Sequence, residues 1–232
     1  MEKISRAIIL AAGYGSRLEP VSKNVPKPLI RVNGIVMIES IIESLLDAGI
    51  KDIIIVVGYL KEQFIYLNKK YNVKLIENKF YNKSNNISSL FSCKDFLDKA
   101  SYIIEGDQII YNKDIFKSNN VKNSGYFVHK ICSFSKEWIL EVEKNKIVNC
   151  YKNGNDKGWE LHGVSKWNAN DLKKIKSFLE KYFYDYSNVF WDEIALVLKK
   201  EDFNLTIFEI NKDDLVEIDT YDELRRIDSS YE

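Results

Sequence analysis

Two glycines and an arginine follow the first apolar run of the sequence, in AIILAAGYGSRL (residues 7–18). Glycines directly after a strand let the backbone approach a ligand closely and point its N–H groups at an anion. Arg17 adds a delocalised positive charge that suits phosphate. The pattern is not a dinucleotide fingerprint, because Leu18 stands where that motif needs glycine, and no Walker A loop is present. Taken alone, Gly13 and Gly15 could also mark nothing more than a tight turn.

The segment NVPKPLI favours the anion-binding interpretation. Pro26 and Pro28 flank Lys27, and proline fixes the backbone on each side of this one charged residue. A loop lysine in solvent is the alternative. Because Lys27 is held in this way shortly after the glycine turn, we expect its ammonium group to point at a phosphate.

Strands and helices alternate over the first 110 residues. Apolar runs and helical spacing predict strands at 7–12, 53–57, 73–76 and 102–104, and helices at 36–48, 60–71 and 87–97. This order predicts an α/β fold: a Rossmann-like, mostly parallel twisted sheet with helices on both faces. Ligands bind beyond the carboxyl ends of such strands, so Gly13 and Asp107 could share one crevice.

The pattern changes after about residue 125. We expect strands at 125–131, 138–142, 147–151, 159–167, 203–210 and 216–219, and helices at 172–183 and 191–200. The C-terminal half should therefore be partly antiparallel. The loops are too short and too weakly biased to be linkers, so residues 1–232 are predicted to form a single domain.

Composition excludes several classes of protein. Lys plus Arg and Asp plus Glu both number 34, so neither bulk nucleic-acid binding nor an anionic membrane surface is indicated. The three cysteines are odd in number and lack C-x-x-C spacing, which favours a reducing cytoplasm. His129 and His162 are too far apart in the chain for a local metal motif and are expected to be ordinary polar or core residues. The N-terminus is expected to be neither a signal peptide nor a membrane span.

The motifs together resemble a known superfamily. AIILAAGYGSRL followed by KNVPKPLI, with IIEGDQII and VEIDTYDEL further on, is similar to the GT-A-like nucleotidyltransferases that join an NTP to a phosphorylated metabolite. Within it, the segments SNNISSLFS, KEW, GVSKW and FWDE resemble bacterial CTP:phosphocholine cytidylyltransferases. The resemblance covers nearly the whole chain, and it implies a nucleotide-binding half at 1–110 and an acceptor-binding half at 111–232.

The resemblance implies attack by a phosphomonoester oxygen on the α-phosphorus of CTP, with release of pyrophosphate. Two anions must meet, so charge neutralisation and positioning should dominate, and the ionised nucleophile needs no general base. Lys27 would bridge the α-phosphate and the incoming phosphate, with Arg17 beside it. The implied nucleotide contacts are Leu10, Ala11, Ala12, Gly13, Gly15, Ser16 and Gly106.

By the same resemblance, Asp107 and Asp219 would hold Mg²⁺, a hard cation that prefers carboxylate oxygens. Asp107 could instead be an ordinary turn residue, and Asp219 could be the N-cap of a helix that begins at YDEL. Asn85, Asn86 and Ser88 are candidates for contact with the cytosine base, since an amide can both donate and accept hydrogen bonds. A helix cap is the alternative role for the two asparagines.

Choline's trimethylammonium group has no N–H and is bound by aromatic faces and a counter-charge. The candidate residues for this cage are Trp138, Phe190, Trp191 and Asp192, although the two tryptophans could also be core residues. Phosphoethanolamine, 2-aminoethylphosphonate and a sugar 1-phosphate are alternative acceptors. A non-catalytic nucleotide-binding subunit is the alternative from another class, and both a monomer and a homodimer are open.

Overall fold

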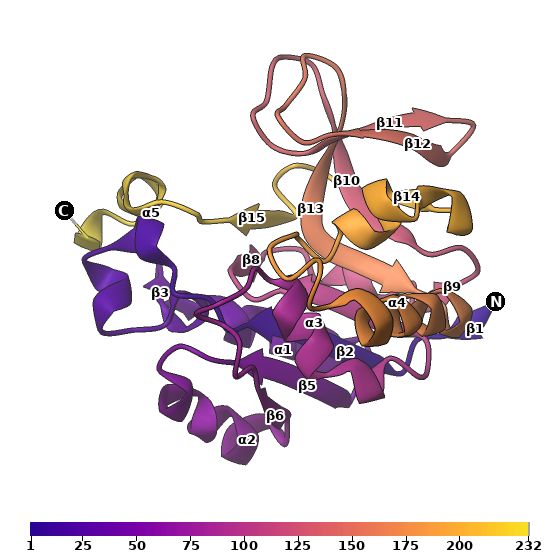
Figure 1. The fold of residues 1–232 in the computed structure, drawn as a ribbon. Coiled ribbons are helices and arrows are strands. Elements are labelled where there is room, and N and C mark those ends of the chain that lie inside the picture. The colour runs from indigo at the N-terminus through magenta and orange to yellow at the C-terminus, as the bar shows by residue number, and fades with distance from the viewer. Residues whose placement is uncertain (232) are drawn as a thin grey trace.

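A mixed sheet of nine strands organises residues 1–231 in the computed structural model (Figure 1). The strand order is β10-β14-β12-β11-β13-β7-β2-β5-β6. In chain order these strands are β2 (Arg6–Ala11), β5 (Asp52–Val57), β6 (Lys74–Glu77), β7 (Ser101–Glu105), β10 (Gly125–Ile131), β11 (Ile139–Glu143), β12 (Lys146–Tyr151), β13 (Gly158–Trp167) and β14 (Thr206–Glu209).

The first half of the sheet is parallel, with helices on both faces. Strands β7, β2, β5 and β6 pair in parallel register. Successive residues of each strand enter two different hydrophobic cores, because side chains alternate across a strand. Helices α1 (Met37–Asp47) and α2 (Ile65–Tyr71) cover one face, and α3 (Ile87–Ser92) and α4 (Ala169–Tyr182) cover the other. The predicted α/β fold is confirmed.

The second half of the sheet is largely antiparallel, as predicted. Strand β13 pairs antiparallel with β7, β10 and β11. Strands β11 and β12 form a hairpin that projects from the body of the molecule (Figure 1). Its turn consists of Lys144 and Asn145, both with positive φ, which suits the twist of a two-residue hairpin loop. The expected helix at 191–200 is a short π-helical turn, Ile194–Leu198.

Several short elements complete the fold. Strands β8 (Gln108–Ile110) and β15 (Leu215–Glu217) form an antiparallel pair that the sequence did not predict. Helix α5 (Tyr221–Ile227) follows β15, and two further pairs are β1 (Glu2–Lys3) with β9 (Asn120–Val121) and β3 (Arg31–Val32) with β4 (Ile35–Val36). Within residues 1–231, no helix combines the length and hydrophobicity that crossing a membrane requires.

The two histidines meet across neighbouring strands. His129 on β10 and His162 on β13 are both buried, and His129 Nδ1 lies 2.9 Å from His162 Nε2. Burial, then the nearby His129 and Lys212, lowers the pKa of His162 to about 4. Burial also lowers the pKa of His129, against an opposing effect of Glu160. The pair is a buried, neutral hydrogen-bonded contact between β10 and β13, which agrees with the predicted role of ordinary polar residues.

This pair predicts a loss of stability in acid. Below about pH 6.5 the unfolded chain protonates His162, whereas the folded chain does not until about pH 4, so the stability falls as the pH falls through this window. The titration of this histidine alone should lower the free energy of unfolding by about 2 kcal/mol at pH 5 relative to pH 7. Urea unfolding at pH 7 and pH 5 should show a smaller loss of stability for His162→Gln than for the wild type. The glutamine amide can take the place of Nε2 in the hydrogen bond. An equal loss in both proteins would contradict the assignment.

Candidate active site

The glycine turn lies directly against Lys27. After β2 the chain turns at Gly15, whose φ is +63°, and a Cβ atom there would lie 2.8 Å from Lys27 Cβ. Gly106 approaches the same strand end, because its N–H donates to the Leu10 carbonyl at 2.8 Å and a Cβ atom would meet that oxygen at 2.9 Å. Both glycines therefore permit close backbone packing around the lysine, and Gly15 does so with a conformation that side chains disfavour.

Four charged side chains from distant parts of the chain form one ion-pair network. Lys27 Nζ lies 2.6 Å from Asp107 Oδ2 and 2.6 Å from Asp219 Oδ1. Arg17 reaches Asp219 Oδ1 at 2.9 Å from the solvent side, where its own side chain is 66% exposed. Desolvation opposes the charge on Lys27, but the carboxylates of Asp107 and Asp219 outweigh it and raise the pKa of the lysine. The structure thus brings together the two cationic residues that the sequence nominated for phosphate and the two aspartates that it nominated for Mg²⁺.

Glu217 is a third carboxylate at this place, and the sequence analysis missed it. One oxygen each of Asp107, Glu217 and Asp219 lies within 4.8 Å of the others. Asp107 Oδ1 is buried and has no hydrogen-bond partner among residues 1–231. Although the Glu217 residue is exposed overall, its carboxyl group faces the other two, and desolvation of this group, followed by repulsion from Asp107 and Asp219, raises the pKa of Glu217. A set of carboxylate oxygens with an unsatisfied buried oxygen fits a hard divalent cation such as Mg²⁺.

The unpredicted β8–β15 pair creates this cluster. Gln108 lies opposite Glu217, so the residues that follow β7 and those that follow β15 meet side by side. Asp219 is not the N-cap of α5, as the sequence had allowed. Thr220 is the N-cap, and Glu223 closes a capping box with it. The Asp219 carboxylate is therefore free to face Lys27.

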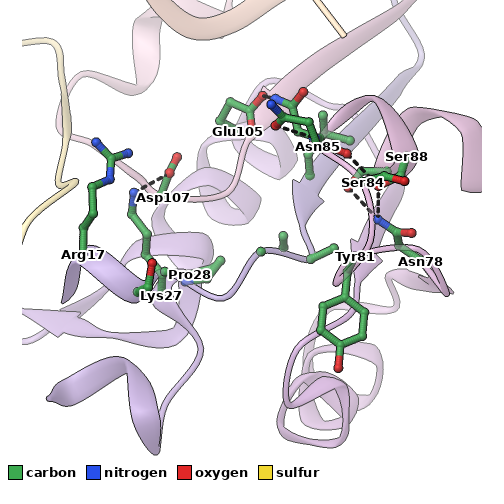
Figure 2. Close-up of a pocket in the computed structure, with 18 residues that line it drawn as sticks. Arg17, Lys27, Pro28, Asn78, Tyr81, Ser84, Asn85, Ser88, Glu105 and Asp107 are labelled. Carbon is green, nitrogen blue, oxygen red and sulfur yellow. Dashed lines mark hydrogen bonds and ion pairs between the residues drawn. The ribbon is translucent and has the colours of Figure 1, made fainter. Parts of the chain in front are cut away.

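A cavity of about 290 Å³ opens beside this network, and we call it the glycine-turn cavity. Figure 2 shows the two walls of this cavity: Arg17, Lys27 and Asp107 lie on one side, and the asparagine and serine side chains lie on the other. All but one of the predicted nucleotide contacts line this cavity: Leu10, Ala11, Ala12, Gly13, Gly15, Ser16, Asn85, Asn86 and Ser88. The exception is Gly106, which is not part of the lining. Cationic groups on one side of the cavity and polar side chains on the other suit a ligand with an anionic end and a polar ring.

The two asparagines do not cap α3 with their side chains. Asn86 occupies the N-cap position without a side-chain cap bond, and its amide instead contacts Glu105 and the backbone of Trp191. Asn85 Oδ1 accepts from the Asn86 N–H. Ser88 is buried, and its hydroxyl accepts from the amide of Asn78 at 2.9 Å. Contacts between these residues and a base stay a prediction.

A second cavity of about 200 Å³ adjoins the first, and we call it the carboxylate cavity. The two cavities share Arg17, Asn86, Glu105 and Asp107. The remaining lining comprises Glu137, Trp138, Leu161, Gly163, Phe190, Asp192, Glu217 and Asp219. The rings of Trp138 and Phe190 meet edge to face with centroids 5.6 Å apart. The structure therefore brings three of the four expected cage residues to the same place.

Trp191 does not lie where the cage hypothesis put it. It is 3% exposed, does not line the carboxylate cavity, and packs against Tyr126 and Trp167 in the hydrophobic core. The expectation that its ring face lies on the cavity wall is therefore corrected. Local sequence could not show this, because FWDE does not specify which of its two adjacent rings points inward.

Glu105 is a further cavity residue that the sequence did not single out. Its Oε1 accepts from Trp191 Nε1 and from Asn86 Nδ2, each at 3.1 Å. Burial, then the charges of Asp107 and Asp192, raises the pKa of Glu105 well above its usual range. Burial likewise raises the pKa of Asp192 to about 7. The carboxylate cavity is thus rich in acidic groups, which suits a ligand with a cationic end.

Comparison with known proteins identifies similar chains. Residues 6–129 match the family model "Nucleotidyl transferase". The chain is 37% identical to 2-aminoethylphosphonate cytidylyltransferase from Lancefieldella rimae, over 98% of this chain and 93% of that protein. It is 38% identical to choline-phosphate cytidylyltransferase from Streptococcus pneumoniae, over 96% of each chain.

Solved structures agree with these relatives. The structure of CTP:phosphocholine cytidylyltransferase from Streptococcus pneumoniae superposes with a TM-score of 0.90 at 35% identity, and the match covers 99% of this chain and 100% of that one. An inositol-1-phosphate CTP transferase from T. maritima matches with a TM-score of 0.78 at 22% identity, covering 98% of each chain, and it supports the fold alone.

Proposed function

The chain belongs to the nucleotidyl transferase family and is a nucleotidyltransferase, and we propose that it transfers the cytidylyl group of CTP to phosphocholine. The products would be CDP-choline and pyrophosphate. The observation that carries the proposal is the arrangement of two adjoining cavities around Lys27, Asp107 and Asp219. One cavity suits the nucleotide, the other suits a cationic acceptor, and the charged network lies at their boundary.

In the proposed reaction, an oxygen of the phosphocholine phosphate attacks the α-phosphorus of CTP. A new P–O bond forms, the bond from the α-phosphorus to the bridging oxygen breaks, and pyrophosphate leaves with that oxygen. Lys27 would pair with the crowded α-phosphate oxygens and exposed Arg17 with the departing phosphates; their ion pairs with Asp219 and Asp107 support this by showing both cations at one place. These residues bind and orient two anions that would otherwise repel each other.

We propose that Asp107, Glu217 and Asp219 hold Mg²⁺ when the nucleotide is bound. When bound, the ion supplies Lewis-acid stabilisation of the phosphate charge. The residues themselves keep three carboxylate oxygens at one place, and Thr220 and Glu223 fix the backbone beside Asp219.

Phosphocholine is the proposed acceptor because rings and carboxylates lie together in the carboxylate cavity. Trp138 and Phe190 offer aromatic surface to a trimethylammonium group, and Asp192, Glu105 and Glu137 provide carboxyl groups whose ionised form a bound cation favours. The relatives from Streptococcus pneumoniae and Haemophilus influenzae, both named choline-phosphate cytidylyltransferase, support this choice.

A second candidate acceptor is 2-aminoethylphosphonate. The burial of Trp191 leaves two rings on the cavity wall, and Lys152 Nζ already lies 5.6 Å from the Trp138 ring centroid. The carboxyl groups of Glu105, Glu137 and Asp192 can accept hydrogen bonds from the N–H groups of a primary ammonium. The relative from Lancefieldella rimae is named for 2-aminoethylphosphonate.

Pyrophosphate release across a matrix of nucleotides and acceptors tests the proposal. We expect CTP with phosphocholine to give the highest kcat/KM, at least about tenfold above 2-aminoethylphosphonate, since about 1.4 kcal/mol of cation–π preference corresponds to that factor. Phosphoethanolamine and a sugar 1-phosphate serve as controls of matched phosphate chemistry. A higher kcat/KM for 2-aminoethylphosphonate would reassign the acceptor and leave the cytidylyl transfer intact.

We also propose that the enzyme acts in the cytoplasm, because its three cysteines are unpaired.

A further inference from the structure

The indole of Trp191 connects the hydrophobic core to the boundary of the two cavities. Its ring lies 5.7 Å from Trp167 and 6.2 Å from Tyr126, centroid to centroid, while its Nε1 donates to Glu105 Oε1 at 3.1 Å. A buried indole N–H needs such a partner, because leaving it unpaired would cost free energy. The ring is therefore fixed by packing, and its N–H fixes the carboxyl group of Glu105.

Asn86 closes a three-membered hydrogen-bond network with these two residues. Its Nδ2 donates to the same Glu105 Oε1 at 3.1 Å, and its Oδ1 accepts from the Trp191 backbone N–H at 2.9 Å. The side chain makes these contacts instead of capping α3. Glu105 Oε1 thus receives two donors, and no described residue donates to Oε2.

The same loop is joined to the acceptor side by backbone contacts. The Asn85 N–H donates to the Ser187 carbonyl at 2.9 Å, and Asn85 Nδ2 donates to the Asn188 carbonyl at 3.3 Å. The residues that follow, Phe190 and Asp192, line the carboxylate cavity. The loop before α3, which lines the glycine-turn cavity, is therefore hydrogen-bonded to the segment that leads into the wall of the other cavity.

Glu105 lies at the place where this network meets both ligand spaces. It lines the glycine-turn cavity and the carboxylate cavity, and Figure 2 shows it between Asp107 and Asn85. With Oε1 held by two N–H groups, rotation of the carboxyl group is restricted, and the acidic wall that it forms with Asp192 keeps one geometry.

We propose that Trp191 and Asn86 are positioning residues for the acceptor: they hold Glu105 at the boundary of the two cavities, where its carboxyl group faces the cationic end of the acceptor. The inference rests on the proposed function, in which the acceptor carries a positive charge. Trp191 then acts through its N–H on Glu105, not through its ring face on the acceptor.

Trp191→Phe is the direct test, because phenylalanine keeps an aromatic ring in the core and removes the N–H donor to Glu105. The substitution also removes ring volume from the core, which the control variant below matches. A bound cation favours the carboxylate form of Glu105, and loss of a hydrogen bond to a carboxylate corresponds to roughly a tenfold change or more, so we expect the acceptor KM to rise by at least about tenfold. The CTP KM should change by less than about twofold. Both constants come from pyrophosphate release with phosphocholine, and with 2-aminoethylphosphonate in parallel.

Trp167→Phe is the matched control. Trp167 is 0% exposed, lies in the same core, and donates its own indole N–H to Ser165 Oγ at 2.8 Å, but it lines neither cavity. Both substitutions should lower the melting temperature by a similar amount, and Trp167→Phe should leave the acceptor KM unchanged. Equal effects of the two substitutions on the acceptor KM, or no effect of Trp191→Phe, would overturn the inference.

Asn86→Asp provides a second variant that does not touch the core. It keeps the oxygen that accepts from the Trp191 N–H and replaces the amide donor to Glu105 with a second oxygen. It should also raise the acceptor KM, and an unchanged acceptor KM would count against the network. If the wild-type protein turned over neither phosphocholine nor 2-aminoethylphosphonate, the proposed function would be wrong, and the inference that rests on it would be wrong too.

Discussion

Asp107→Asn and Asp219→Asn are each expected to lower kcat by about 10³-fold, with the fold retained. Each replacement removes a negative oxygen from the carboxylate cluster, which we propose binds Mg²⁺. Metal binding contributes several kcal/mol of charge stabilisation, and each 1.36 kcal/mol is a factor of ten in rate. Steady-state kinetics at increasing Mg²⁺ and the rise in melting temperature that Mg²⁺ with CTP produces should both reveal the loss.

Asp222→Asn is the control for these two variants. Asp222 is exposed, lies three positions after Asp219, and is outside the cluster, so its replacement should leave kcat near the wild-type value. Near-wild-type turnover of Asp107→Asn or Asp219→Asn at saturating Mg²⁺ would exclude that residue from the metal site.

Lys27→Ala is expected to lower kcat by about 10²–10³-fold and to weaken CTP binding much less. The ammonium group matters most when the α-phosphate becomes crowded with negative oxygens, that is, in the transition state. Because Lys27 Nζ also neutralises Asp107 and Asp219 at 2.6 Å, we expect a lower melting temperature in metal-free buffer. Single-turnover rates and equilibrium titration with CTP separate the two effects.

Lys23→Ala serves as the matched control for Lys27→Ala. Lys23 lies on the same segment, is exposed, and pairs only with Glu19 among the described residues. Its removal should change neither kcat nor CTP affinity appreciably, since exposed ion pairs contribute little. If Lys27→Ala weakened CTP binding and left kcat unchanged, Lys27 would be a binding residue only.

The order of strands and helices was predictable because each is determined by local pattern. The β-branched run at 53–57 became β5 (Asp52–Val57), and the amphipathic pattern at 36–48 became α1 (Met37–Asp47). A buried parallel strand must be apolar throughout, and a helix on a sheet must be apolar on one side, so the sequence records both. The family was also predictable, since the glycine turn and Lys27 lie within 15 residues of each other; the match to the family model confirms it.

Local sequence also nominated Arg17, Lys27, Asp107 and Asp219, but it could not show how they meet. Lys27 is separated from Asp107 by 80 positions and from Asp219 by 192, and it contacts both. Only the pairing of β8 with β15 brings those carboxylates together and adds Glu217. The strand expected at 216–219 corresponds to β15, but the three-residue β8 carries too weak a periodic signal to be recognised, and local pattern does not specify that the two strands pair.

The direction of individual side chains was decided by the tertiary structure. Phe190 and Trp191 are adjacent and equally aromatic in the sequence, yet Phe190 lines the carboxylate cavity and Trp191 enters the core beside Trp167. Likewise His129 and His162, 33 positions apart, form a hydrogen-bonded pair across β10 and β13. The sequence determined which residues could supply charge and aromatic surface, because these are properties of the side chains themselves. Which of them face a ligand depends on packing between elements far apart in the chain, and only the folded structure specifies that packing.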